Sequence, residues 1–303
     1  MKAVKSLSAL ALVLVLVLGG CGGGGERNGG SEKAGKLTVG SKNFTENILL
    51  AHMMAILIEE NMDIRVERKV NLGGSNVAWQ ALRNGDIQMY VDYSGTIVAN
   101  YYQEETGNAE ETLARAKELV ERDNLKFLEP WGFNNTYTLA VKQDLADELG
   151  LETYSDLAKV SDRLVIGCEF EFLDRPDGLP GLKEVYGMTF ADEKGMDAGL
   201  RYPSIGEGKV DVINAYATDG MLVVHQLKIL QDDKSFFPPY HGAPLVRQDA
   251  LERYPGLEAL FNRLAGKLDD VTMQRLNAKV DAEGLKEEDV AREFLVELGL
   301  IEG

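Results

Sequence analysis

Two tyrosines have the same sequence setting in two well-separated segments. In GDIQMYVDYSGT (85–96) and GKVDVINAYATDG (208–220), a glycine is followed eight residues later by Tyr93 or Tyr216, and small polar residues come next. The face of a phenol ring carries partial negative charge and attracts a cation. If each segment ends a strand that points into one cleft, the two rings could be opposite walls of a cation-binding pocket. Otherwise they are separate core residues.

The residues before Tyr93 predict the elements that would position it. The predicted strands are 36–41, 64–70 and 87–91, and the predicted helices are 42–61 and 76–85. Asn43 stands three residues before Glu46, which predicts a capping box at the start of the first helix. This β-α-β-α-β order is typical of a mostly parallel sheet covered by helices.

The rest of the chain predicts a second α/β unit and a helical return. After a helix at 111–123, the predicted strands are 137–142, 163–170, 210–216 and 227–232, with helices at 153–162 and 177–187. The segments 249–268, 270–284 and 286–299 are helical, and we expect them to pack on the first unit. The predicted lobes are 36–138 with 241–303, and 139–240. Their cleft is the expected ligand site.

Two further tyrosines are expected near the segments that cross between the lobes. Tyr137 begins the strand after FNN, and Tyr240 lies in FFPPYHG at the return crossing. With Tyr93 and Tyr216 they could form a box around a quaternary ammonium group, which has no proton to donate. Each ring would contribute roughly 0.5–2 kcal/mol. The alternative is that these are ordinary half-buried residues among the eleven tyrosines of the chain.

The N-terminal segment is expected to direct export and anchoring. Lys2 and Lys5 precede the apolar run 9–20, which is too short for a permanent membrane span and suits residues 1–20 as a signal peptide. The run ends in LGGC, which resembles the bacterial lipoprotein box and predicts lipidation of Cys21. Two acyl chains on that cysteine would anchor the chain stably to a membrane. The glycine-rich stretch that follows, to residue 35, predicts a flexible tether.

Composition argues against several other classes of protein. Removal of residues 1–20 leaves 30 basic and 49 acidic residues, a formal charge of −19, which does not favour nucleic acid as a partner. With Cys21 lipidated, Cys168 has no disulfide partner. The three histidines lack metal-ligand spacing, and we expect no metal and no cofactor. No nucleophile or phosphate-binding motif is present, and the chain is predicted not to be an enzyme.

The chain from residue 37 to its end resembles the substrate-binding proteins of bacterial ABC importers for glycine betaine, choline and related osmoprotectants. The motifs that carry the resemblance are GSKNFTE (40–46), GDIQMYVDYSGT (85–96), NNTYTLAV (134–141), EFLDRPDGLPGL (171–182) and AYATDG (215–220). The resemblance implies an α/β fold of the type II periplasmic-binding-protein kind, two-lobed with the ligand between the lobes. It also implies an aromatic box of four tyrosines, which match Tyr93, Tyr137, Tyr216 and Tyr240.

Three polar residues match the family's positions for binding a ligand carboxylate. Lys42 lies at the start of a predicted helix, where free N–H groups and the helix dipole favour an anion. Arg175 could add two parallel donors from the second lobe, and Thr96 could donate its hydroxyl. The alternative for Lys42 and Arg175 is solvated surface charge. A receptor that prefers choline would not need these residues, because choline has no carboxylate.

The resemblance implies a monomeric solute receptor, held outside the cytoplasm by lipidated Cys21, that delivers an osmolyte to an ABC permease and its ATPase. Glycine betaine is the expected ligand, and choline or carnitine are alternatives within the same class. A different class, an extracytoplasmic α/β hydrolase, could use Glu169 and Glu171 in CEFEF as paired carboxylates. Their alternation with phenylalanine instead predicts a strand end with one solvated face. A ligand-free sensory or assembly module is the third alternative.

Overall fold

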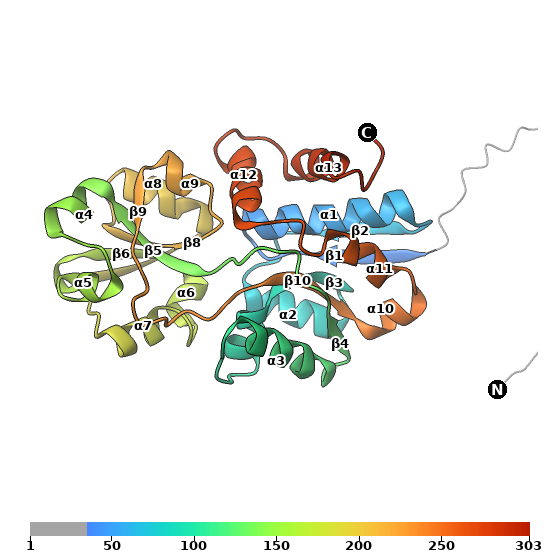
Figure 1. The fold of residues 1–303 in the computed structure, drawn as a ribbon, viewed down its shortest axis with the longest axis horizontal. Helices are drawn as coiled ribbons and strands as arrows, with labels where there is room; N and C mark the ends of the chain where they lie inside the picture. Colours follow the sequence, from blue (N-terminus) through green and yellow to red (C-terminus); the bar gives the residue numbers. More distant parts are fainter. Residues whose placement is uncertain (1–34) are drawn as a thin grey trace, which may run out of the picture. The chain divides into compact units, whose positions relative to one another are not determined.

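The computed structural model describes residues 35–303, which form two α/β lobes (Figure 1). The predicted signal segment, Cys21 and nearly all of the predicted tether lie outside the described residues. Within 35–303, no helix has both the length and the apolar character needed to cross a bilayer. Each lobe contains one five-stranded mixed sheet with helices packed on it. The predicted two-lobed α/β architecture is therefore confirmed.

The sheet of lobe 1 combines a parallel part with a strand that arrives late in the sequence. Its strand order is β2 (Arg65–Lys69), β1 (Lys36–Gly40), β3 (Met89–Tyr93), β10 (Gly242–Arg247) and β4 (Leu125–Phe127). β1 is parallel to both β2 and β3, whereas β10 is antiparallel to β3 and β4. Strands β4 and β10 were not predicted. β4 has only three residues, and β10 contains Pro244, which lowers its strand signal.

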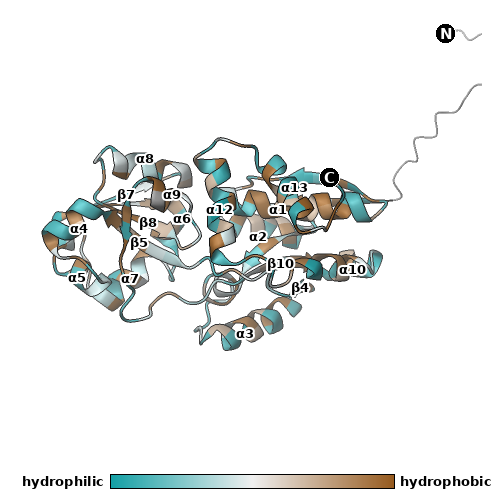
Figure 2. Cartoon of the chain, turned by 45° about the horizontal axis from the view of Figure 1, so that its top comes forward, coloured by the Kyte–Doolittle hydropathy of each residue, from teal (hydrophilic) through white to brown (hydrophobic). Residues whose placement is uncertain are grey.

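The helices of lobe 1 pack around its sheet, and several of them contact the longest helix, α1. They are α1 (Thr45–Asn61), α2 (Ser75–Asn84), α3 (Ala109–Glu121), α10 (Gln248–Arg253), α11 (Leu257–Phe261), α12 (Asp270–Asp281) and α13 (Glu287–Glu297), with a π-helical turn η1 (Thr96–Tyr101) and a 3-10 turn η4 (Asn262–Leu264). Helices α11, α12 and α13 pack against α1, as expected. Because neighbours cover it, α1 is hydrophobic along most of its length, whereas α4 and α10 carry many hydrophilic residues (Figure 2).

The start of α1 differs from the sequence prediction. The helix begins at Thr45 after Phe44, and no side chain caps it, so the predicted capping box of Asn43 and Glu46 is wrong. Glu46 is instead almost fully buried and accepts hydrogen bonds from other elements, including Thr218 in lobe 2. A capping box requires the glutamate side chain to turn back toward its own helix start, and these tertiary partners hold it elsewhere.

Lobe 2 repeats the pairing pattern of lobe 1. Its strand order is β7 (Asp192–Met196), β6 (Val165–Glu169), β8 (Val212–Tyr216), β5 (Tyr137–Lys142) and β9 (Leu227–Ile229). Its helices are α4 (Gln143–Leu149), α5 (Tyr154–Ala158), α6 (Phe170–Asp174), α7 (Leu179–Tyr186), α8 (Arg201–Gly206) and α9 (Met221–Val224), with 3-10 turns η2 (Ser161–Arg163) and η3 (Ala198–Leu200). β6 is parallel to β7 and β8, and β5 is antiparallel to β8 and β9.

The chain crosses between the lobes twice, before β5 and before β10 (Figure 1). As a result, each sheet contains one antiparallel strand that follows directly on a crossing. An isolated bridge between Asn134 and His241 joins the two crossing segments. The crossings therefore lie side by side, and the residues just after them are positioned close to both lobes.

Candidate ligand-binding site

A small cavity is lined by residues from both lobes. Its volume is about 20 Å³, room for roughly one water molecule. All seven ligand-binding residues predicted from the sequence line it: Tyr93, Tyr137, Tyr216, Tyr240, Lys42, Thr96 and Arg175. The lining also includes four residues that were not predicted: Phe44, Ser75, Asn135 and Glu171. We call the four tyrosines the tyrosine cage.

Sheet register places the four tyrosines. Tyr93 is the last residue of β3 and Tyr216 the last of β8, the central strand of each sheet. Tyr137 begins β5 directly opposite Tyr216 in the antiparallel ladder. Tyr240 precedes Gly242, the residue of β10 that pairs with Tyr93. The tyrosines therefore occupy related positions in the two sheets, and all four are buried.

The rings form one contiguous cluster. The centroids of Tyr137 and Tyr216 are 5.1 Å apart in a stacked arrangement, and Tyr240 meets Tyr137 edge-on at 5.4 Å. Phe44 joins the lobes, because its ring stacks on Tyr216 at 5.4 Å and on Tyr93 at 6.3 Å. Tyr137 contacts both Tyr216 and Tyr240, and the cavity has a volume of only about 20 Å³, so a methylated ammonium group can enter only if the rings move apart.

A glycine makes room for one of the rings. A Cβ atom on Gly95 would lie 2.8 Å from the carbonyl oxygen of Pro239 and 2.9 Å from the ring of Tyr240. Real side chains do not pack this closely, and the carbonyl is backbone. The glycine of the DYSGT motif therefore permits the close approach of Tyr240 to the turn after β3.

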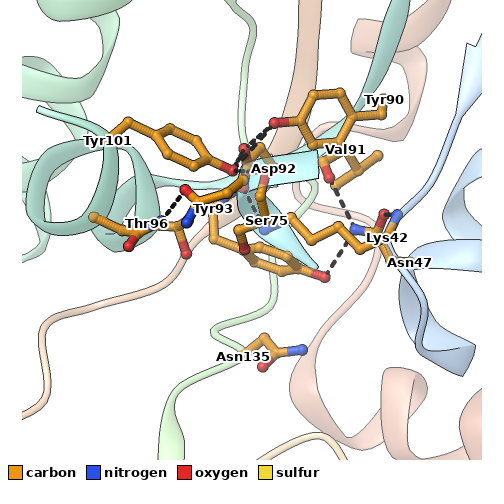
Figure 3. Close-up of polar contacts among 12 residues, drawn as sticks. Lys42, Asn47, Ser75, Tyr90, Val91, Asp92, Tyr93, Thr96, Tyr101 and Asn135 are labelled. Atoms are coloured by element: carbon orange, nitrogen blue, oxygen red, sulfur yellow. Dashed lines mark hydrogen bonds and ion pairs between the residues drawn. The ribbon is translucent and has the colours of Figure 1, made fainter. Parts of the chain in front are cut away.

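Lys42 is held in place by an ion pair with the sheet of lobe 1. Its ammonium group forms a buried ion pair with Asp92 of β3, with 2.7 Å between Nζ and Oδ1. Asp92 also accepts hydrogen bonds from the hydroxyls of Tyr90 and Tyr101, as Figure 3 shows. The Lys42 Nζ lies 4.9 Å from the ring centroid of Tyr93. Lys42 is therefore a fixed, paired cation beside the cage and not a solvated surface charge.

Arg175 is also buried and paired. Its guanidinium donates two hydrogen bonds to Asp177, at 2.7 and 2.5 Å, and one to Glu171 at 2.6 Å. The Nη2 atom that donates to Asp177 also donates to the Thr96 hydroxyl of lobe 1, at 3.3 Å. The guanidinium carbon is 5.6 Å from the ring centroid of Tyr137. Both predicted carboxylate-binding cations thus already have anionic partners within the protein.

Glu171 was misread from the sequence. The strand β6 ends at Glu169 and α6 begins at the next residue, so CEFEF is not a strand end with solvated glutamates. Phe170 is 58% exposed, while Glu169 is 8% exposed. Burial opposes ionisation of Glu171, but Arg175 and Lys42 outweigh it and lower its pKa to about 2. Glu171 is therefore an ionised carboxylate in the cavity lining.

Hydrogen bonds join the two lobes on both sides of the cavity. On one side, the Ser75 N–H at the start of α2 donates to Glu171 Oε2 at 2.7 Å. On the other side, the Thr218 hydroxyl donates to Glu46 Oε2 at 2.6 Å, and Gln274 donates to the carbonyl of Ala217 at 2.7 Å. The lobes are therefore closed around the cavity. Opening must break these contacts.

The lining offers groups that bind a ligand through noncovalent contacts. It offers aromatic faces, two paired cations and hydroxyl or amide donors. Within residues 35–303, no group of three or more histidine, cysteine or acidic side chains could hold a metal ion. Cys168 is buried, and burial raises the pKa of its thiol, which disfavours the reactive thiolate.

Two of the unpredicted lining residues had a signal in the sequence. Phe44 lies two residues from Lys42 inside GSKNFTE, and Asn135 lies two residues before Tyr137 inside NNTYTLAV. Proximity to a predicted site residue could have marked both. Ser75 had no such signal, because it reaches the cavity only through the position of α2 against lobe 2.

Comparison with known proteins identifies the family. Residues 35–297 match the family described as the substrate-binding domain of ABC-type glycine betaine transport systems. The glycine-betaine-binding protein of Pseudomonas aeruginosa is 36% identical, over 90% of this chain and 91% of that protein. The carnitine transport binding protein OpuCC of Listeria monocytogenes is 34% identical, over 100% of this chain and 98% of that protein.

A solved structure supports the same assignment. The crystal structure of a glycine betaine/carnitine/choline ABC transporter protein superimposes with a TM-score of 0.70 at 32% identity, covering 87% of this chain and 99% of the other. The predicted two-lobed fold of the periplasmic-binding-protein kind is thereby confirmed. With both lobes, the cavity lining and these relatives taken together, the chain belongs to the substrate-binding protein family of ABC-type glycine betaine transport systems.

Proposed function

We propose that this protein is an extracytoplasmic receptor for glycine betaine or a closely related quaternary ammonium osmolyte, which it delivers to an ABC permease and its ATPase. The observation that carries the proposal is the convergence of four tyrosines, Lys42, Thr96 and Arg175 from both lobes on one cavity. The tyrosine cage surrounds the methylated nitrogen, and the desolvated rings attract its charge. No covalent step is involved.

The other end of the ligand is assigned to the polar side of the cavity. Lys42 and Arg175 supply positive charge, and the hydroxyl of Thr96 supplies a donor. Because each cation is paired with a protein carboxylate, a ligand carboxylate gains part of its binding energy by sharing these donors. A carboxylate-bearing ligand is therefore favoured over choline only if its carboxylate can approach Arg175 despite the ionised Glu171 nearby.

Lobe closure couples ligand occupancy to transport in this proposal. The closed contacts between the lobes, such as Thr218 with Glu46, hold the rings near one another. A ligand that enters between separated rings and is then enclosed by both lobes stabilises a closed population, which the permease recognises. Lipidation of Cys21 is proposed to keep the receptor at the outer face of the membrane, with the residues before 36 as its tether. The lobes are assigned as 36–138 with 241–303, and 139–240.

The experiment is calorimetric titration of glycine betaine, carnitine and choline against the wild-type protein and the Lys42→Met and Arg175→Met variants. If the carboxylate assignment is right, both variants weaken glycine betaine by about tenfold or more and change choline much less, since a charged hydrogen bond contributes about 1.5–3 kcal/mol. Wild-type binding of choline more than tenfold tighter than glycine betaine would reject the carboxylate role. Binding of none of the three would reject the proposed function.

Choline remains the second candidate ligand, because both cations of the cavity are already neutralised by Asp92, Asp177 and Glu171. The titration separates the two. An extracytoplasmic hydrolase is an alternative from a different class. Incubation with glycine betaine followed by NMR spectroscopy tests for an enzyme: consumption of the ligand over hours would favour catalysis, and an unchanged spectrum supports binding alone.

A further inference from the structure

Three of the four cage tyrosines donate their phenolic hydrogen to a buried carboxylate. The pairs are Tyr93 with Glu46 at 2.8 Å, Tyr216 with Glu169 at 2.7 Å, and Tyr240 with Asp177 at 2.7 Å. We call these three acids the cage carboxylates. Each is less than 10% exposed. None of them is in the cavity lining, and each lies at the hydroxyl end of its ring.

Glu46 is the most unusual of the three because it has no positive partner among residues 35–303. It forms no ion pair, and its oxygens accept only from neutral groups: the Tyr93 hydroxyl, the amides of Asn135 and Asn277 and the hydroxyl of Thr218. A buried carboxylate without a counter-ion is costly to a fold. Burial raises the pKa of Glu46, the hydrogen bonds of its neutral partners oppose that rise, and Asp219 adds to it.

The other two cage carboxylates do have cations. Glu169 pairs with Arg201 at 2.9 Å, and Asp177 pairs with Arg175 at 2.5 Å. The charges around the cage nevertheless do not balance. Three buried cations, Lys42, Arg175 and Arg201, stand against six carboxylates that contact them or the cage: Glu46, Asp92, Glu169, Glu171, Asp177 and Asp219. The excess is negative when all are ionised.

A hydroxyl that donates to a carboxylate shifts electron density into its ring. In a low-dielectric interior the hydrogen bond and the carboxylate charge are weakly screened, so both make the ring face more negative. A more negative face attracts a cation more strongly and leaves a neutral group of the same shape almost unaffected. The arrangement thus acts on the charge of the ligand and not on its shape.

Tyr137 is the contrast within the same cage. Its hydroxyl forms no hydrogen bond with any of the described residues, and its ring packs on Phe172 at 4.9 Å and lies near the Arg175 guanidinium. It is held in place by apolar packing and by the β5–β8 ladder. The carboxylate bonds are therefore not a general requirement for positioning a ring at this site, which points to an electrostatic role for them.

We propose that the cage carboxylates act electrostatically through the rings bonded to them and make the tyrosine cage selective for a cation over a neutral group of the same shape, with Glu46 contributing most. This inference rests on the proposed function. The ligand's ammonium group is the counter-ion that Glu46 lacks within the fold. The ring of Tyr93, whose hydroxyl is bonded to Glu46, transmits the attraction.

The test compares two pairs of ligands that differ only in carbon for nitrogen. Glycine betaine is matched with 3,3-dimethylbutanoate, and choline with 3,3-dimethylbutan-1-ol. Affinities are measured for the wild type and for Glu46→Gln, Glu169→Gln and Asp177→Asn. We expect Glu46→Gln to weaken both cationic ligands by about five- to tenfold, and the other two variants by about two- to fivefold, with the carbon analogues changed by less than twofold.

A tyrosine–carboxylate pair outside the cage provides the matched control. Tyr102 donates to Asp123 at 2.5 Å, and neither residue lines the cavity. Asp123→Asn removes the same kind of contact and is expected to leave both ligand pairs unchanged. If Glu46→Gln does not fold, Tyr93→Phe replaces it. That variant keeps the ring and the carboxylate but removes the hydrogen bond, and it is expected to weaken only the cationic ligands.

The outcomes separate this inference from the proposed function. Equal weakening of cation and carbon analogue in the glutamine variants would show a merely structural role and overturn the inference. Unchanged affinity of these variants for the cationic ligands would also overturn it. Failure of the wild type to bind any methylated ammonium ligand would instead reject the proposed function itself.

Discussion

The two lobes place their tyrosines in the same way. In each sheet the central strand, β3 or β8, ends in a tyrosine and pairs antiparallel with a strand that follows a crossing between the lobes. The crossing segments supply the second tyrosine, Tyr240 before β10 and Tyr137 at the start of β5. Sheet topology, which the lobes share, therefore accounts for the four rings of the cage.

The lobes differ in how they hold their cations. In lobe 1, β1 leads into the long buried helix α1, and Lys42 just before it pairs with Asp92 on another strand. In lobe 2, β6 leads at once into the five-residue helix α6, and Arg175 pairs with Asp177 two residues away. The first cation is fixed by tertiary structure and the second by local sequence. The shared sheets thus give the cage, and the segments after β1 and β6 give the polar end of the site.

The largest expected effect comes from removing a ring that belongs to the shared part. Tyr216→Ala removes a ring that stacks on Tyr137 and also reaches Phe44 of the other lobe. We expect it to weaken glycine betaine by about tenfold or more, because a desolvated cation–π contact contributes up to about 2 kcal/mol. Tyr93→Ala, the related position in lobe 1, is the paired measurement and should weaken binding to a similar extent.

Calorimetric titration measures both variants, with circular dichroism to show that each folds. An affinity for Tyr216→Ala within twofold of the wild type would break the comparison, because the related strand ends would then not have related roles. A loss of affinity in only one of the two variants would mean that the cage is not shared between the sheets.

Much of this shared scaffold could be predicted from the sequence. Tyr93 and Tyr216 follow clear strand patterns at equal spacing from a glycine, and the fold places both in one cavity lining. β7 (DEKGM) escaped prediction because an exposed edge strand shows no alternation of apolar and polar residues. Short strands and edge strands form mainly because they pair with neighbouring strands in the folded protein. A local sequence pattern does not show that pairing.

The polar side of the site was less accessible to sequence reasoning. Lys42 and Arg175 line the cavity with the predicted tyrosines, but their pairing with Asp92 and Glu171 was not foreseen. The carboxylate of Glu46 was assigned to a local cap, whereas its partners come from residues far along the chain. Such contacts depend on how the two lobes meet, and no short segment of sequence carries that information.

The next expected effect concerns the one cage ring that depends on a glycine. Gly95→Ala would place a Cβ atom 2.9 Å from the ring of Tyr240 and 2.8 Å from a backbone carbonyl. Overpacking of this kind costs about 1–3 kcal/mol. We expect a lower melting temperature and an affinity for glycine betaine reduced by about three- to tenfold, because the displaced ring no longer fits the cage.

Gly199→Ala is the matched control, since a Cβ there would meet no atom within 4 Å. It should leave both the melting temperature and the affinity near wild type. The prediction sharpens the comparison between lobes: Tyr240 depends on a close approach to Gly95, whereas Tyr137 is held by its ladder with β8. Wild-type affinity for Gly95→Ala would mean that the position of Tyr240 does not matter.

The smallest expected effect lies where the lobes meet through like charges. Burial raises the pKa of Asp281 in α12 to about 6. The charges of Asp219 in lobe 2 and of Glu287 add to this rise, whereas the Thr45 hydroxyl and Arg201 oppose it. Because the native state favours the protonated form, this carboxyl stabilises the fold below its ordinary pKa near 4, and the contribution is lost as the pH rises through about 6.

Asp281→Asn should therefore raise the melting temperature relative to wild type at pH 7.5, and by less at pH 4.5. By its accessible surface Asp281 is exposed, so solvent screens its charge and we expect a difference of about 2 °C or less. Thermal unfolding at the two pH values measures it. A difference that grows as the pH falls would mean that Asp281 is stabilised as the anion and would contradict the prediction.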